Sequence, residues 1–216
     1  MVVTIHQPDF LPWLGFFDRW RRSDLFIVLD DVQFIRRGWH HRDRIKTHNG
    51  VQWLTVSIVK KGRYFQQIRE VALNNTTHWK SKHLGMIESA YKKAPSFERC
   101  FNSIQEIYQK EHYLLIDLNL DLLNYFAGEL GITTPILFSS DLHVKSDSTQ
   151  RLVDLVKSIN GSTYLTGLGA VDYLDESLFQ KEKIMVSWQE FTHPVYRQLH
   201  GEFVPTLSTL DYLMMQ

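Results

Sequence analysis

A histidine and several polar side chains follow directly after a short apolar run near the start of the chain. The apolar run is Val2–Ile5, and the segment after it reads His6-Gln7-Pro8-Asp9-Phe10-Leu11-Pro12-Trp13. An imidazole donates or accepts a proton near neutral pH, so His6 is a candidate general acid or base, with Gln7 and Trp13 as candidate ligand contacts. A histidine that caps its strand, followed by prolines that set a turn, is the structural alternative.

A second candidate is the basic stretch at residues 36–46, which reads Arg-Arg-Gly-Trp-His-His-Arg-Asp-Arg-Ile-Lys. Guanidinium groups bind phosphate through two parallel hydrogen bonds, and Trp39 offers a stacking face, so Arg42 and Arg44 are candidate phosphate or nucleotide contacts. A solvated charged loop is the alternative. RNA binding uses similar residues, but one short stretch on a chain without net charge gives it little support.

A third candidate is Thr166-Gly167-Leu168-Gly169, which lies between a predicted strand and a predicted helix. Gly167 and Gly169 would let backbone N–H groups approach a phosphate or a sugar. Asp172 stands where a dinucleotide fingerprint has its third glycine, so that fingerprint fits poorly. A tight turn without a ligand explains the same glycines.

Composition narrows the class of protein. Lys plus Arg and Asp plus Glu both total 24, and this balance argues against binding nucleic acid or an anionic membrane through bulk charge. No metal-binding, phosphate-loop or serine-elbow motif occurs, so we assign no metal and name no cofactor. Cys100 falls in a predicted helix, where a structural thiol is expected. The start has no signal-peptide pattern and no apolar run is long enough to span a bilayer, so we expect a cytoplasmic protein.

The pattern of apolar residues predicts an α/β fold. Val2–Ile5, Trp13–Arg22 and Leu25–Leu29 form a strand–helix–strand unit, which pairs its strands in parallel. Residues 77–130 show only helical spacing and are expected to form an insert or cap on one side of the sheet. We therefore predict one domain, residues 1–216, with a Rossmann-like, parallel-containing sheet and a helical insert at about 77–130.

Further elements are predicted on both sides of the insert. Strands at 53–58 and 68–73 would be joined by a turn at 60–63. The other predicted strands are 135–138, 162–166 and 184–188. Helices are predicted from after Ser148 through Ile159, at 170–179 and at 209–214, the last capped by Ser208. Because parallel strands share one carboxyl edge, the loops after Ile5, Leu29 and Thr166 are expected to line one pocket.

Several blocks in this order resemble the WbqC-like family over nearly the whole chain. They include Ile5–Phe17, Leu29–Phe34, Arg42–Lys46, Trp53–Val56, Trp79–His83, Thr149–Leu152, Tyr164–Gly167 and Leu207–Asp211. The sequence departs from the family pattern at His41, Asp43 and Ser57. The resemblance implies a bacterial protein of polysaccharide or O-antigen biosynthesis that acts on sugar precursors, commonly nucleotide-linked ones. The residues that the family motifs carry over are His6, Gln7, Asp30, Asp31, Arg42, Arg44, Thr166 and Gly167.

The resulting expectation is a transferase that moves a small acyl or aminoacyl group to a sugar or nucleotide-linked sugar. His6, Asp30 and Asp31 would be catalytic, Arg42 and Arg44 would hold phosphates, and the partner would be an acyl or aminoacyl donor or a carrier protein. One alternative is a module that binds a sugar nucleotide or a partner enzyme without catalysis. Another is a nucleotidyltransferase of the HIGH type, although no second histidine follows at residues 14–16.

Overall fold

The computed structural model describes residues 1–216, and the chain forms two compact units. The sheet unit consists of residues 1–7, 15–31 and 132–192. The helical unit consists of residues 8–14, 32–131 and 193–216. Each unit is therefore assembled from three separate stretches of the sequence.

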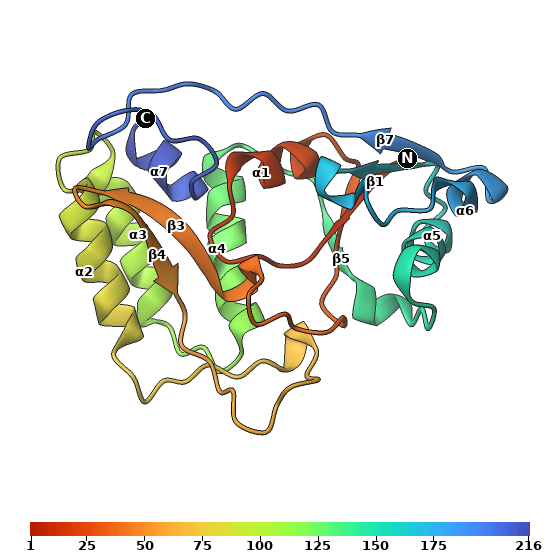
Figure 1. Cartoon of the computed structure of the whole chain (residues 1–216), viewed down its shortest axis with the longest axis horizontal. Coiled ribbons are helices and arrows are strands. Elements are labelled where there is room, and N and C mark those ends of the chain that lie inside the picture. Colours follow the sequence, from red (N-terminus) through yellow and green to blue (C-terminus); the bar gives the residue numbers. More distant parts are fainter. The chain divides into compact units, whose positions relative to one another are not determined.

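A five-stranded, fully parallel sheet is the centre of the sheet unit (Figure 1). Its strands are β1 (Val2–His6), β2 (Leu25–Val28), β5 (Ile136–Phe138), β6 (Thr163–Thr166) and β7 (Met185–Trp188). They lie in the order β5-β2-β1-β6-β7, so the direction of winding reverses between β1 and β6. This confirms the α/β class, the Rossmann-like order and the predicted parallel pairing of the first two strands.

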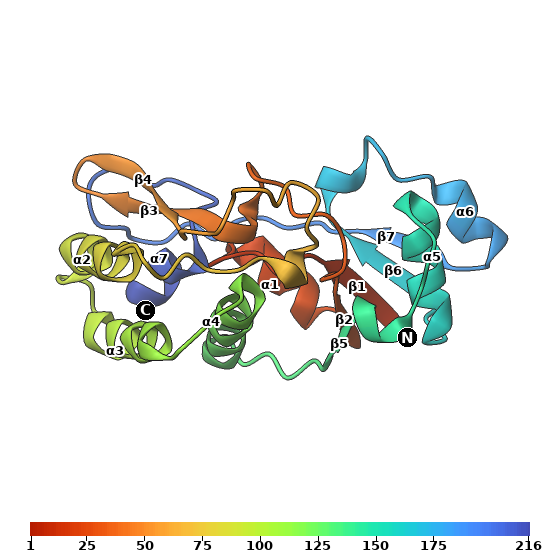
Figure 2. The same ribbon diagram turned by 90° about the horizontal axis from the view of Figure 1, so that it is seen from below.

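Helices cover both faces of this sheet because side chains alternate along each strand. The helices are α1 (Leu14–Arg21), α5 (Ser148–Ser158) and α6 (Glu176–Lys181). Phe26 stacks on Trp20 of α1, with ring centroids 4.8 Å apart. Its neighbour Ile27 belongs instead to a core cluster with Val153 of α5 and Phe179 of α6. Figure 2 shows α1 on one side of the strands, with α5 and α6 on the other.

The helical unit combines a two-stranded hairpin with four helices (Figure 1). The elements are β3 (Arg42–Thr47), β4 (Gly50–Thr55), α2 (Trp79–Tyr91), α3 (Phe97–Gln109), α4 (Leu115–Glu129) and α7 (Thr209–Met214). Residues 77–130 hold three of these helices and no strand, as predicted. Ser208 caps α7 by accepting a hydrogen bond from the backbone of Leu210, which was also predicted.

Two local predictions were wrong, the strand at 68–73 and the helix at 170–179, whereas the predicted turn at 60–63 is present, with the Arg63 N–H donating to the carbonyl oxygen of Lys60 at 3.4 Å. The strand that pairs with β4 is β3, inside the basic stretch, and not 68–73, where the structure has a 3-10 turn at Ile68–Glu70. The β3–β4 hairpin turns at His48 and Asn49, and the next residue, Gly50, has a φ of +87°, which favours glycine. The predicted helix 170–179 is a short turn at Leu168–Ala170 followed by α6, which starts late because Asp175 caps it. Two other 3-10 turns span Trp39–His41 and Ser139–Leu142.

Candidate functional site

The carboxyl edge of the parallel sheet gathers most of the predicted site residues. In open α/β sheets, ligands bind outside the carboxyl ends of the strands at the point where the winding reverses. That point lies between β1, which ends at His6, and β6, which ends at Thr166. The strand β2, which leads to Asp30, is the neighbour of β1 on its other side. The three loops therefore leave the same edge of the sheet from adjacent strands.

The structure divides the predicted residues between the two units. The sheet unit contains His6, Gln7, Asp30, Asp31, Thr166, Gly167 and Gly169, whereas the helical unit contains Trp13, Arg42 and Arg44. Trp13 forms an isolated bridge with Ser208, and its ring stacks on that of His193 at a centroid distance of 6.5 Å. Trp13 thus has local packing partners within the helical unit.

The half-buried imidazole of His6 has a defined orientation. Its Nδ1 lies 2.9 Å from the carbonyl oxygen of Gln7, and the Phe16 ring meets it edge-on at 4.9 Å between centroids. Because a carbonyl oxygen only accepts hydrogen bonds, Nδ1 carries the proton in the neutral ring. The nitrogen that gains or loses a proton is then Nε2. This tautomer suits a general base, and a histidine that only caps its strand has the same bond.

Asp30 joins the ends of two neighbouring strands, β2 and β5. Its carboxylate accepts hydrogen bonds from the Ser140 backbone N–H at 3.1 Å and from the Ser140 hydroxyl at 2.8 Å. The hydroxyl of Ser139 lies 3.0 Å from the same carboxylate. The side chain is buried, so these bonds compensate it for the loss of water. They give Asp30 a structural role, and its catalytic role stays a prediction.

Asp31 forms an ion pair with Arg151, which sequence reasoning did not assign to the site. Arg151 Nη2 lies 2.6 Å from Asp31 Oδ2, and Arg151 Nη1 donates to the carbonyl oxygens of Val144 and Ser146. Both side chains are mostly buried, at 12% and 14% exposure. The guanidinium therefore fixes the loop after β2 to the first turn of α5. The signal was present in the sequence, because Arg151 belongs to one of the blocks that resemble the family.

The glycine after β6 makes room for a buried arginine. A Cβ atom at Gly167 would lie 2.5 Å from Nη1 of Arg19, which in turn donates to the Gln189 side chain at 2.8 Å. Gln189 also donates to the carbonyl oxygen of Gly15 at 2.8 Å. Packing against Arg19 therefore explains the glycine at position 167 without a ligand. Gly169 has no atom within 4 Å of its Cβ position, so packing does not require a glycine there. Ligand contact at both positions stays a prediction.

The predicted arginines lie on a strand rather than in a loop, and they stack on tryptophans. Arg42 Cζ lies 4.5 Å from the centroid of the Trp53 ring, and Arg44 Cζ lies 5.4 Å from that of Trp39. The two tryptophan rings are 5.4 Å apart and remain 45% (Trp39) and 42% (Trp53) exposed. We call Trp39, Arg42, Arg44 and Trp53 the Arg–Trp face. It offers flat aromatic surface beside fixed positive charges.

Three titratable residues close to these arginines in sequence, Asp43, His40 and His41, are buried and mainly uncharged at neutral pH. Burial, helped by the nearby Asp9, raises the pKa of Asp43 to about 8, although the Arg44 backbone N–H opposes this rise. Burial also lowers the pKa values of His40 and His41 to about 4. These histidines are therefore uncharged at neutral pH, and the positive charge of this stretch comes from its four arginines and Lys46.

The remaining sequence expectations concern metals, thiols and membranes. No group of three or more His, Cys, Asp or Glu side chains is placed to hold a metal ion. Cys100 is buried in α3, with Sγ 3.5 Å from the carbonyl oxygen of Leu213, as expected for a structural thiol. None of the helices has both the length and the apolar character needed to cross a membrane.

Comparison with known proteins gives the family of the chain. The sequence model of the WbqC-like protein family matches residues 7–216. An uncharacterized protein of Mycobacterium tuberculosis is 37% identical over 213 residues, which cover 98% of this chain and 92% of that protein. No solved structure matches the chain significantly. Because the family match extends over nearly the whole sequence, the chain belongs to the WbqC-like protein family.

Proposed function

We propose that this protein is a transferase of surface-polysaccharide (O-antigen) precursor synthesis. It moves a small acyl or aminoacyl group to a sugar or nucleotide-linked sugar. The observation that carries the proposal is the position of His6 at the end of β1, beside the point where the winding of the sheet reverses. Membership of the WbqC-like family supports a sugar precursor as the acceptor.

In this proposal His6 is the general acid and base. Nε2 takes the proton from an acceptor hydroxyl or amine while that group attacks the acyl carbon of an activated ester or thioester. The new bond to the acceptor forms, the bond to the donor breaks, and the imidazolium returns its proton to the leaving group. The Gln7 carbonyl, 2.9 Å from Nδ1, supports this role because it favours the tautomer with Nε2 unprotonated. Such catalysis is typically worth about 10²–10⁴-fold in rate.

Phosphate binding is assigned to the Arg–Trp face. Two exposed indole rings beside Arg42 and Arg44 suit a nucleotide, because a base stacks on indole and a guanidinium group binds phosphate. The experiment that tests this binding is independent of the one that tests His6. A nucleoside diphosphate should bind the wild-type protein. Arg42→Ala should weaken this binding by about tenfold or more, which corresponds to roughly 1.5–3 kcal/mol for a charged hydrogen bond.

The first experiment is a thermal-shift screen with nucleotides, nucleotide sugars and acyl or aminoacyl pantetheine thioesters. Ligands that bind only the folded protein raise its melting temperature. Pairs of hits are then incubated together, and mass spectrometry detects transfer of the group to the sugar. His6→Gln should keep the melting temperature and KM while turnover falls about 10²–10⁴-fold, because glutamine keeps the size and polarity but exchanges no proton.

Three other outcomes would replace the proposal. If His6→Gln lowers the melting temperature and leaves the turnover of the folded protein unchanged, His6 only caps its strand. If nucleotide sugars bind and no donor yields a product, the protein is a binding module for sugar nucleotides. Release of pyrophosphate from a nucleoside triphosphate would instead indicate a nucleotidyltransferase.

A further inference from the structure

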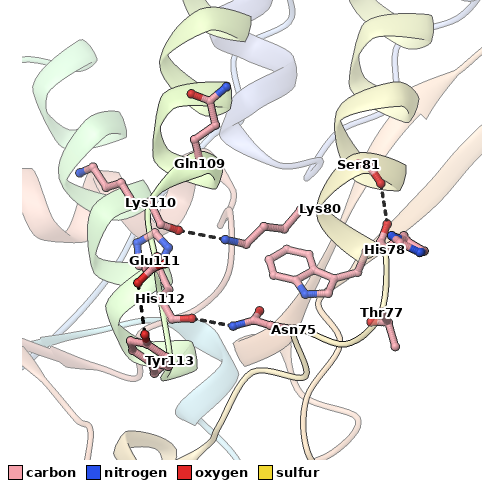
Figure 3. A pocket seen from close by; sticks show the side chains of 11 residues that line it. Asn75, Thr77, His78, Lys80, Ser81, Gln109, Lys110, Glu111, His112 and Tyr113 are labelled. Carbon is pink, nitrogen blue, oxygen red and sulfur yellow. Dashed lines mark hydrogen bonds between the residues drawn. The ribbon is translucent and has the colours of Figure 1, made fainter.

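A pocket of about 420 Å³ lies in the helical unit, remote in sequence from His6 and outside the Arg–Trp face (Figure 3). One wall is the turn before α2 with the start of that helix, and the other is the link between α3 and α4. Two hydrogen bonds tie the walls together. Asn75 Nδ2 donates to the carbonyl oxygen of His112 at 2.9 Å, and Lys80 Nζ donates to that of Lys110 at 3.0 Å. The pocket is therefore built by fixed side chains.

Two buried nitrogen atoms of the pocket-lining residues have no hydrogen-bond partner. They are Nε1 of Trp79 and Nδ1 of His112, in residues that are each only 5% exposed. An indole N–H is only a donor, so Trp79 requires an acceptor. Nε2 of His112 lies 2.9 Å from Oδ2 of Asp121, so Nδ1 is the ring nitrogen without a partner. Buried polar groups without partners are rare in folded proteins, and a bound ligand or water would satisfy them.

The charges around the pocket favour an anion. The 13-residue helix α2 begins at Trp79, and no side chain caps its first turn. Its N–H groups thus carry the partial positive charge of a helix start. The ammonium group of Lys80 donates to a neutral carbonyl, whereas Lys110 is paired with Asp121. Glu111 is the one acidic side chain in the lining, and it accepts a hydrogen bond from the hydroxyl of Tyr113.

We propose that this pocket binds a phosphate group. Its oxygens would accept hydrogen bonds from the Trp79 indole, the Lys80 ammonium and the first turn of α2. A helix start together with a lysine is a common way to bind phosphate. This site belongs to the helical unit and shares no residue with those proposed for catalysis, so it stands or falls independently of the transferase function.

The test is an NMR titration of the six tryptophan indole N–H signals with inorganic phosphate at constant ionic strength. Trp79→Phe identifies the Trp79 signal and removes the donor. That signal should shift and saturate with phosphate. Calorimetry should show that Lys80→Met weakens binding at least tenfold without a change in melting temperature. Lys82→Met is the matched control, because Lys82 is exposed on the same helix and does not line the pocket.

Two further ligands distinguish the chemistry. Glycerol 3-phosphate tests a phosphorylated metabolite against free phosphate, and the tighter of the two identifies the source. Glycerol has the same hydroxyl groups without the charge and should not bind. The proposal is overturned if phosphate does not shift the Trp79 indole signal. It is also overturned if Lys80→Met and Lys82→Met weaken phosphate binding equally, or if glycerol binds as tightly as glycerol 3-phosphate. Loss of folding in Trp79→Phe would leave the Lys80 and Lys82 comparison as the deciding measurement.

Discussion

Replacing Asp43 with asparagine should change how the stability of the protein depends on pH. Asp43 is 3% exposed, and burial raises its pKa to about 8 in the folded chain. In the unfolded chain the carboxyl has an ordinary pKa of about 3.9. Between these values the folded protein holds a proton that the unfolded protein lacks. The stabilisation is complete below about pH 4 and is lost as pH rises toward 8.

The size of the effect follows from the width of this window. Each pH unit inside it lowers the free energy of unfolding by about 1.4 kcal/mol. The whole window corresponds to roughly 5 kcal/mol, which is a large part of the usual 5–15 kcal/mol of a domain. The amide introduced by Asp43→Asn would keep an oxygen to accept the hydrogen bond from the Arg44 backbone, now 2.6 Å from the Asp43 carboxylate, and it does not titrate. The variant should therefore be the more stable protein at pH 8.

The assay is urea unfolding followed by tryptophan fluorescence between pH 6.5 and 8.5. The difference between Asp43→Asn and wild type isolates this carboxyl, because Asp211, whose pKa burial also raises, is present in both proteins. Asp172→Asn, in an exposed loop, is the control and should follow the wild-type curve. If Asp43→Asn and wild type lose stability in parallel across this range, the buried protonated carboxyl does not exist.

Three other predictions concern stability. Burial lowers the pKa values of three histidines, His40, His41 and His83, to about 4. The protein should therefore lose stability as pH falls from about 6.5 toward 4. Replacing one of these histidines by Gln should make the melting temperature fall less steeply over this acidic range. Gly167→Ala should cost about 1–3 kcal/mol, measured by urea unfolding, because its Cβ meets the Arg19 guanidinium, while Gly169→Ala should cost almost nothing. Arg151→Met should cost about 3–5 kcal/mol by stranding the Asp31 carboxylate, and Asp31→Asn in the same chain should restore part of it in calorimetry.

The sheet could be predicted because its central strands are continuous apolar runs. Val2–Ile5 and Leu25–Leu29 are buried on both faces, and such runs favour parallel strands. The order of the loops along the carboxyl edge then follows from the parallel pairing, which is why His6, Asp30 and Gly167 were expected on one edge. Apolar runs also predicted the ends of β5, β6 and β7 to within one or two residues.

The hairpin could not be predicted because the buried residues of its first strand are mostly polar. Asp43 and Lys46 are buried in β3, so the strand lacks the apolar alternation that marks a half-buried strand. Lys46 is tolerated there because its ammonium group donates to Gln198 and to the carbonyl oxygens of Gly201 and Glu202. These partners lie far away in the sequence, and no local pattern reveals them.

Contacts distant in sequence also explain what was missed at the candidate sites. Arg19 meets Gln189 across 170 positions of sequence, and Asp31 meets Arg151 across 120. No spacing rule connects such residues, although Asp31 and Gln189 each follow a predicted strand. The phosphate pocket has no motif either, because its walls come from the start of one helix and the link between two others.

The position of β1 has a consequence for synthesis of the chain. β1 is made first and lies in the middle of the sheet, yet its neighbour β6 begins only at Thr163. At a translation rate of about 5–20 residues per second, one edge of β1 stays without its partner for roughly 8–30 s. An open strand edge pairs readily with other chains. Ribosome-bound fragments that end before β6 should therefore be prone to aggregation, and the completed sheet should not, because its outer strands, β5 and β7, are only three and four residues long.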